Sequence, residues 1–85
     1  MILKFAKSTE KDYKKLSLNI QKKADKQFEL LLTNYHHPSL RSRKMGKGNI
    51  FEARVDRHYR FTFQIEEDEI NILTIGPHDE GLGKK

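Results

Sequence analysis

The sequence contains no cysteine, which excludes a disulfide framework and a thiolate zinc site. It also has no stretch that approaches the roughly 18 consecutive apolar residues of a membrane-spanning helix. Residues 1–7 are too short to form a signal peptide. We therefore expect a cytoplasmic protein without membrane contact, and the length of 85 residues is that of one domain with a small core.

Negative charge is scarce in one part of the chain, where the positive excess is concentrated. Seventeen Lys and Arg residues face twelve Asp and Glu residues, for a formal net charge of +5. Between residues 36 and 60 only two acidic residues occur, Glu52 and Asp56. The basic residues of that segment are Arg41, Arg43, Lys44, Lys47, Arg54, Arg57 and Arg60. Such a cluster indicates an acidic partner, either a nucleic acid or an acidic protein.

Hydrophobic periodicity predicts a strand over residues 1–6 and two helices after it. Ser8 or Thr9 is suited to cap the first helix, whose first turn then contains acidic residues. A break is expected at residues 17–19. The second helix carries an apolar stripe at helical spacing, formed by Ile20, Ala24, Phe28, Leu31 and Tyr35. Pro38 ends this helix because a proline disfavours helical geometry at the residue before it.

The remaining chain predicts a basic loop and three strands. The loop covers residues 38–49, and strands are expected at residues 49–55, 59–66 and 69–75, where apolar and polar residues alternate. The order β-α-α-β-β-β is an α+β fold, with two N-terminal helices packed on one face of a small, mainly antiparallel sheet. No linker or repeat divides the chain, so residues 1–85 are expected to form a single domain.

The alternation also fixes the register of the hairpin formed by the second and third strands. A three-residue loop at residues 56–58 turns every apolar pair toward the helices, whereas a two-residue loop scrambles both faces. The same register places Arg54 directly opposite Arg60, where like charges destabilise a sheet. Because guanidinium groups match phosphate oxygens, this pair indicates a phosphate site. The alternative is that Glu52 pairs with Arg54 while Arg60 extends into water.

The fourth strand leads toward the same site. Pairing across a tight turn at residues 66–69 brings Ile75 opposite Arg60. A turn at residues 76–77 then directs His78 toward the two arginines. A histidine beside an anion site can transfer protons at neutral pH. The alternative is an ordinary surface histidine.

Three segments resemble elements of the RelE/ParE toxin superfamily. They are residues 48–55 (GNIFEARV), 58–63 (HYRFTF) and 70–78 (INILTIGPH). These segments are similar to the family's aromatic-x-x-Arg-Val, Tyr-Arg-x-x-aromatic and terminal strand-to-histidine elements. The upstream residues 38–41 and the pair of helices also fit, so the resemblance spans nearly the whole chain.

The resemblance implies a RelE-like fold and the toxin of a type II toxin–antitoxin system. In many members the activity is ribosome-associated cleavage of mRNA, by attack of a ribose 2′-oxygen on the adjacent phosphate, without a metal or a small-molecule cofactor. The implied partners are mRNA, the ribosome and a cognate antitoxin. Arg60 matches the family's transition-state arginine, Arg54 a basic second-strand residue and His78 the terminal acid–base residue. Further RNA contacts are expected from Arg41, Arg43, Lys44, Lys47, Arg57 and His58.

Two positions depart from the family's pattern and leave the general base unassigned. Ser39 stands where some members carry a glutamate base, and Arg54 stands where others use a lysine, although arginine scarcely deprotonates. The alternative function is a non-catalytic RelE/ParE-fold interaction module, either a gyrase-directed toxin or a degenerate RelE domain. A plain RNA-binding module is the third alternative. It ranks lowest because the sequence predicts no exposed aromatic platform for bases.

Overall fold

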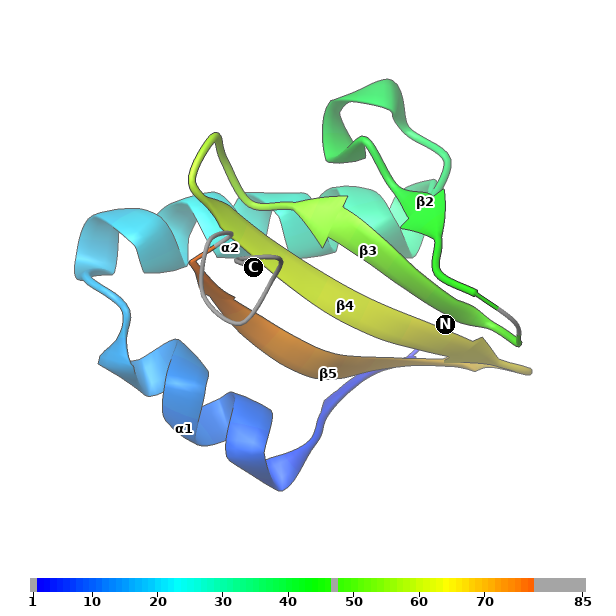
Figure 1. Ribbon diagram of the computed structural model, residues 1–85, viewed down its shortest axis with the longest axis horizontal. Helices are drawn as coiled ribbons and strands as arrows, with labels where there is room; N and C mark the ends of the chain where they lie inside the picture. Colours follow the sequence, from blue (N-terminus) through cyan, green and yellow to red (C-terminus); the bar gives the residue numbers. More distant parts are fainter. Residues whose placement is uncertain (1, 47, 78–85) are drawn as a thin grey trace.

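The structure is a computed structural model that describes residues 2–46 and 48–77 (Figure 1). Within those residues, five strands form one sheet in the order β1-β5-β4-β3-β2, in which β1 runs parallel to β5 and the other neighbours are antiparallel. The elements are β1 (Ile2–Phe5), α1 (Lys7–Lys15), α2 (Leu18–Thr33), the 3₁₀ helix η1 (Pro38–Leu40), β2 (Arg43–Lys44), β3 (Ile50–Arg54), β4 (Tyr59–Glu66) and β5 (Glu69–Pro77). The predicted α+β fold is confirmed.

The core lies between the helices and one face of the sheet. Phe61 and Phe63 of β4 are fully buried, and Phe28 of α2 packs edge-to-face on Phe61 with ring centroids 5.1 Å apart. Burying a side chain of this size contributes about 1.5–3 kcal/mol. The opposite face, called the outer face below, carries neither α1 nor α2 (Figure 1). On it the hydroxyl groups of Thr62 and Thr74 hydrogen-bond at 2.7 Å.

Both helices differ from the predicted boundaries at one end. The first helix begins at Lys7 without a side-chain cap, so the predicted capping by Ser8 or Thr9 is wrong. Thr9 is buried instead, and its hydroxyl donates a hydrogen bond to the Leu73 carbonyl of β5. The hydroxyl group is therefore used in a tertiary contact rather than at the helix terminus.

The second helix begins where the sequence predicted a break, but it ends early. The Ser17 hydroxyl caps it by accepting a hydrogen bond from the Ile20 amide at 3.2 Å. It ends at Thr33, so Tyr35 lies beyond the helix rather than in its apolar stripe. Asn34 adopts an extended conformation there and ends the helix before Pro38 can act.

The predicted register of the β3–β4 hairpin is confirmed. Ala53 pairs with Phe61, and Arg54 pairs with Arg60. The Asp56 carboxylate stabilises the turn, because its Oδ1 accepts hydrogen bonds from the amides of His58 and Tyr59 at 2.8 and 3.0 Å.

The β4–β5 hairpin has the predicted tight turn, but a β-bulge shifts its far end by one residue. The irregularity falls between Thr62 and Phe63, and it leaves Leu73 of β5 without a direct partner. Ile75 consequently lies opposite Phe61, and Gly76 lies opposite Arg60, so the predicted pairing of Ile75 with Arg60 is wrong. A regular register would turn Ile75 to the outer face, whereas the bulge keeps it in the core at 5% exposure.

The predicted basic loop between α2 and β3 is partly ordered into two short elements. Leu40 of η1 is fully buried and fixes the segment on the core. After it, β2 pairs with β3 through Arg43 opposite Glu52 and Lys44 opposite Phe51. The alternation of residues did not predict so short an edge strand. No helix in the described part of the chain is long and apolar enough to span a membrane.

Candidate anion-binding site and comparison with known proteins

Within residues 2–46 and 48–77, four arginine side chains and one carboxylate line a hollow of about 310 Å³. They come from the end of η1, from β2, from β3 and from β4, and we call this hollow the arginine pocket. Its lining residues are Arg41, Arg43, Glu52, Arg54 and Arg60. The structure thus brings Arg54 and Arg60 together, as the alternation predicted, and adds two arginines from the segment between α2 and β3.

Arg54 lies in a strongly positive environment. Its Nε atom is buried and has no hydrogen-bond partner among the described residues. The pKa of Arg54 is held below its ordinary value, first by burial and then by the positive charges of Arg41, Arg60 and Arg57, which Asp56 only partly offsets. A buried donor without a partner is unusual in a folded protein. An anionic ligand would both pair with this guanidinium group and relieve the repulsion.

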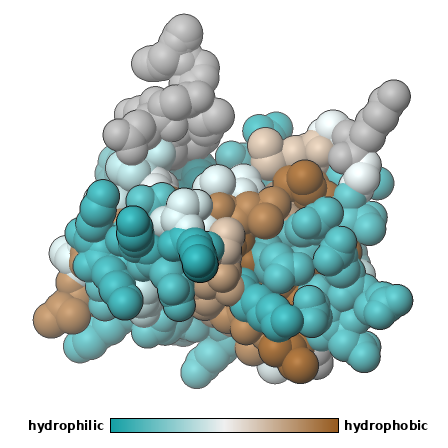
Figure 2. Space-filling view, turned by 90° about the horizontal axis from the view of Figure 1, so that it is seen from below, coloured by the Kyte–Doolittle hydropathy of each residue, from teal (hydrophilic) through white to brown (hydrophobic). Residues whose placement is uncertain are grey.

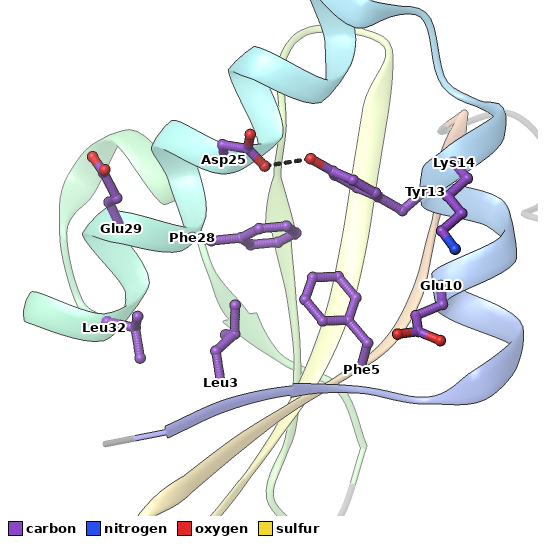
Figure 3. A pocket seen from close by; sticks show the side chains of 9 residues that line it. All are labelled: Leu3, Phe5, Glu10, Tyr13, Lys14, Asp25, Phe28, Glu29 and Leu32. Atoms are coloured by element: carbon purple, nitrogen blue, oxygen red, sulfur yellow. Dashed lines mark hydrogen bonds between the residues drawn. The ribbon is translucent and has the colours of Figure 1, made fainter.

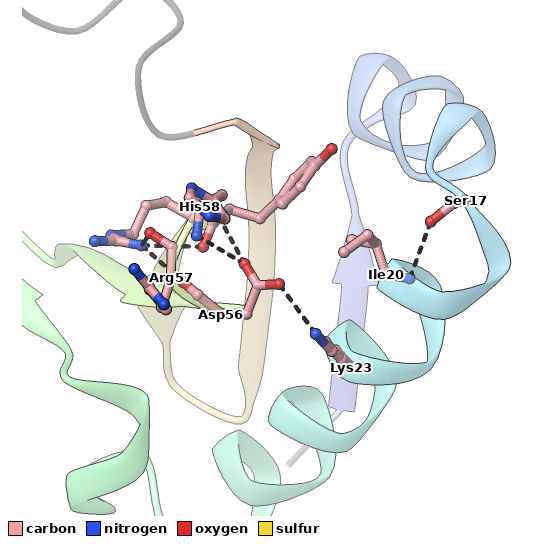
Figure 4. A network of polar contacts seen from close by, with 8 residues as sticks. Ser17, Ile20, Lys23, Asp56, Arg57 and His58 are labelled. Carbon is pink, nitrogen blue, oxygen red and sulfur yellow. Dashed lines mark hydrogen bonds and ion pairs between the residues drawn. The ribbon is translucent and has the colours of Figure 1, made fainter.

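Arg60 is oriented by the β3–β4 turn. Its Nη1 atom donates to the carbonyl oxygens of Asp56, Tyr59 and Arg57 at 2.9, 3.2 and 3.4 Å. The turn is connected to α2 by an ion pair between Lys23 and Asp56 at 3.4 Å (Figure 4). The hairpin therefore sets the direction of the Arg60 guanidinium group before any ligand binds.

The pKa of Asp56 reflects the interactions that its carboxylate makes in this turn. Burial raises the pKa of its carboxyl group, but the amides of His58 and Tyr59 and the ammonium group of Lys23 lower it by more. The net pKa lies below the ordinary value. The charged form of Asp56 is therefore the one that stabilises the turn.

Glu52 has a different partner from the one considered in the sequence. Its Oε1 accepts a hydrogen bond from Nε of Arg43 at 3.2 Å, so Glu52 pairs with β2 and does not neutralise Arg54. Among the described residues, no carboxylate lies within ion-pairing distance of Arg54 or Arg60. Sequence reasoning missed Glu52 as a site residue because it did not foresee β2, although alternation places Glu52 on the same face as Arg54.

The other predicted RNA-binding residues fall into two groups. Lys44 on β2 and the turn residues Arg57 and His58 are exposed, but they are not among the residues that line the arginine pocket. Lys47 and His78 lie outside the described residues.

The chain immediately before His78 differs from the prediction. Gly76 and Pro77 continue β5 instead of forming a turn, and Pro77 pairs with Tyr59. Gly76 lies opposite Arg60, so the last described residue, Pro77, is one position away from the partner of Arg60 on β5. Over residues 2–46 and 48–77, no group of three or more His, Asp or Glu side chains is arranged to hold a metal ion.

A second hollow, of about 490 Å³, lies between α1, α2 and β1 (Figure 3). Tyr13 donates a hydrogen bond from its hydroxyl group to Asp25 at 2.6 Å across this groove, and burial together with Asp25 raises the pKa of Tyr13 to about 12. The groove is lined by Leu3, Phe5, Glu10, Tyr13, Lys14, Asp25, Phe28, Glu29 and Leu32. Figure 2 shows apolar surface bordered by hydrophilic residues on the side of the molecule seen from below. The sequence indicated only core positions here.

Comparison with protein families identifies the chain. The family model described as the ParE toxin of the type II toxin–antitoxin system parDE matches residues 3–82. The chain belongs to this toxin family. The resemblance to the RelE/ParE superfamily that the motifs predicted is therefore confirmed. Comparison with curated proteins by sequence gives no match.

Several solved structures share the fold of this chain at low sequence identity. The YoeB/ParE toxin from Agrobacterium tumefaciens is 12% identical, with a TM-score of 0.80 over 92% of this chain and 99% of that one. The archaeal RelE–RelB complex from Pyrococcus horikoshii contains a chain that is 19% identical, with a TM-score of 0.78 over 94% and 97% of the two chains. The RelBE toxin–antitoxin complex from E. coli contains a chain that is 15% identical, with a TM-score of 0.75 over 88% of this chain and 93% of that one.

Proposed function

We propose that this ParE-family toxin is a ribosome-associated, metal-independent endoribonuclease that cleaves mRNA in the cytoplasm. The observation that carries the proposal is the arginine pair on the outer face. Arg54 and Arg60 lie directly opposite each other in a pocket that two further arginines line, and neither has a carboxylate partner in the described part of the chain. Such a site suits a phosphate whose negative charge increases during the reaction.

The proposed reaction is attack of a ribose 2′-oxygen on the adjacent phosphorus, with departure of the 5′-oxygen. Arg54 and Arg60 stabilise the phosphorane charge, because guanidinium groups bind phosphate oxygens two at a time. His78 supplies the proton to the departing oxygen, since β5 leads the chain to the neighbourhood of Arg60. The RNA backbone is held by charge, through Arg41, Arg43, Lys44, Lys47, Arg57 and His58.

A cognate antitoxin is the proposed protein partner. The solved complexes from E. coli and Pyrococcus horikoshii hold a relative of this fold together with its own antitoxin, RelB. The apolar groove between α1, α2 and β1 offers this chain a surface of the kind that an amphipathic helix binds. The acidic side chains at its border then select basic residues on the partner.

Cleavage mapping in a translation extract tests the activity. We expect the purified chain to cut translated mRNA in the presence of EDTA and to leave 2′,3′-cyclic phosphate and 5′-hydroxyl ends. Arg60→Ala should lower the rate by about 100-fold or more while the protein stays folded, because one electrostatic stabiliser of the transition state is removed. Lys22→Ala is the control, since it removes the same charge from an exposed position of α2. Intact mRNA with the wild-type chain would refute the proposal.

The second candidate is a non-catalytic, gyrase-directed toxin. Two observations favour it: the matching family model is that of ParE, and Nη1 of Arg60 already serves three carbonyl oxygens of the turn. A structural role of this kind needs no RNA. Inhibition of purified gyrase in a supercoiling assay, together with intact mRNA in the translation extract, would establish this function.

A further inference from the structure

Among the described residues that line the arginine pocket, one side chain can accept a proton. Four of these five residues are arginines, whose guanidinium groups only donate hydrogen bonds and scarcely deprotonate. The fifth, Glu52, is a carboxylate. Attack by a 2′-hydroxyl group needs a nearby acceptor for its proton. We propose that Glu52 is this general base, an inference that rests on the RNA cleavage proposed above.

The η1 position at which some relatives carry a glutamate does not supply the base here. Ser39 stands there, and its hydroxyl group lies 3.0 Å from Nδ1 of His37. Its carbonyl oxygen accepts a hydrogen bond from the Gln27 amide. Ser39 is also not among the residues that line the arginine pocket. The sheet, rather than η1, therefore provides the proton acceptor.

The register of β3 places Glu52 where a base is needed. Glu52 and Arg54 are two positions apart on one strand, so they share the outer face and are separated by roughly 7 Å along it. Arg54 in turn faces Arg60 on β4. Glu52 is thus the next outer-face residue along β3 from the arginine pair. A phosphate bound between the two arginines would have its adjacent ribose next to the Glu52 carboxylate.

Arg43 covers this carboxylate from the edge strand. The side chain of Glu52 is only 9% exposed, whereas that of Arg43 is 73% exposed. Their ion pair joins Nε of Arg43 to Oε1 alone. When Arg43 turns toward an RNA phosphate, the carboxylate becomes accessible to the ribose. The charged groups that share the pocket with Glu52 are Arg41 after η1, Arg43 on β2, Arg54 on β3 and Arg60 on β4.

The step balances with the groups proposed. The 2′-oxygen forms a bond to phosphorus while its proton passes to the Glu52 carboxylate. The bond between phosphorus and the 5′-oxygen breaks, and that oxygen takes a proton from the general acid, His78. The products are a 2′,3′-cyclic phosphate and a 5′-hydroxyl group, and exchange with water restores both side chains.

The test is the pH dependence of single-turnover RNA cleavage. Glu52→Gln keeps an oxygen that can accept the hydrogen bond of Arg43 but removes the basic group. We expect its rate to fall by about 100- to 10,000-fold, the usual contribution of a positioned base. The rise in the wild-type rate on the acid side of the pH profile should disappear with it. Glu52→Asp should restore part of the rate and the rise.

The control is Glu69→Gln, which removes a carboxylate that also pairs with a basic residue across strands, Lys4, but lies outside the arginine pocket. It should cleave like the wild type. Folded Glu52→Gln protein that cleaves at the wild-type rate with the same pH profile would overturn the role of Glu52 and leave RNA cleavage standing. Absence of cleavage by the wild type overturns both.

A second pair of variants applies if Glu52→Gln fails to fold. Arg43→Gln retains the carboxylate, whereas Arg43→Gln/Glu52→Gln places two amides opposite each other on β2 and β3. Both variants lack the arginine, so only the carboxylate distinguishes them. The acid-side rise should be present in the first and absent in the second, and its presence in both would overturn the inference.

Discussion

Two pairs of like charges face each other across strands of the same sheet, at opposite ends of β4. Arg54 lies opposite Arg60 near the β3–β4 turn, and Glu66 lies opposite Glu69 at the β4–β5 turn. One member of the acidic pair has a partner on the neighbouring strand, where Nζ of Lys4 lies 3.0 Å from Oε2 of Glu69. For the arginine pair, no carboxylate does the same among the residues that the structure describes.

The two pairs differ in whether an opposite charge offsets the repulsion between like charges. Directly opposed like charges destabilise a sheet, and the acidic end shows how this sheet relieves them. A carboxylate also exists near the arginine end, since Glu52 shares the outer face with Arg54, yet it pairs with Arg43. Arg54 and Arg60, called the inner arginines below, therefore have no carboxylate partner among the described residues, which supports the phosphate site proposed above.

The largest expected effect comes from removing one inner arginine. Arg54→Gln should lower the RNA cleavage rate by about 100-fold, because it removes a stabiliser of the phosphorane charge. Its melting temperature should rise, because the repulsion from Arg41, Arg60 and Arg57 is removed. Lys4→Gln is the matched change at the acidic end, and it should leave the cleavage rate unchanged. Cleavage assays and thermal unfolding measure the two effects, and a lowered melting temperature of Arg54→Gln would contradict the repulsion argument.

A smaller effect is expected from the turn that orients Arg60. Asp56→Ala should lower the free energy of unfolding at pH 7 by about 1–3 kcal/mol, because the amides of His58 and Tyr59 lose a charged acceptor. The pKa of Asp56 is lower in the folded protein than the ordinary value of about 3.9. Its stabilisation is therefore complete above that value and is lost as the pH falls through the lowered pKa.

Urea unfolding at pH 7 and at about pH 2.5 measures this contribution. The difference between the wild type and Asp56→Ala should be large at pH 7 and should shrink at the acidic pH. Asp56→Asn is the control that retains an acceptor oxygen for the two amides while removing the charge that Lys23 binds. An equal difference at both pH values would show that the charge of Asp56 does not stabilise the turn.

The smallest expected effect concerns RNA binding by the basic residues of the segment between α2 and β3. Replacing Arg41 and Lys44 with glutamine should flatten the salt dependence of RNA binding by roughly 0.7–0.9 log units for each phosphate group that the variant no longer binds. Replacing Lys22 and Lys26 of α2 removes the same charge elsewhere on the surface and should leave the slope unchanged. Titrations at several salt concentrations compare the two double variants. Equal slopes would show that the segment between α2 and β3 does not bind RNA.

Much of the sheet was predictable because alternation is a local property of the chain. Apolar and polar residues alternate in both strands of the β3–β4 hairpin, and this alternation together with a three-residue loop predicted that Arg54 lies opposite Arg60. The bulge at Leu73 was not predictable in the same way. It depends on keeping Ile75 in the core and on the hydrogen bond between the Leu73 carbonyl and the Thr9 hydroxyl.

The candidate site was predictable in part for the same reason. Sequence spacing identified the two inner arginines, but Glu52 was considered only as a partner of Arg54. Its pairing with Arg43 depends on β2, an edge strand of two residues that pairs with β3. So short a strand has no periodicity from which it can be recognised.

The amino-acid sequence by itself determined the fold class, the hairpin register and the excess of positive charge at one end of the sheet. These properties follow from residue spacing and from charge, which act between near neighbours in the chain. Only the tertiary structure decided which groups share the arginine pocket. Arg41 and Arg43 reach it because buried Leu40 fixes their segment on the core, and the Glu52 carboxylate binds Arg43 because β2 pairs with β3. Such interactions join residues that no local pattern relates.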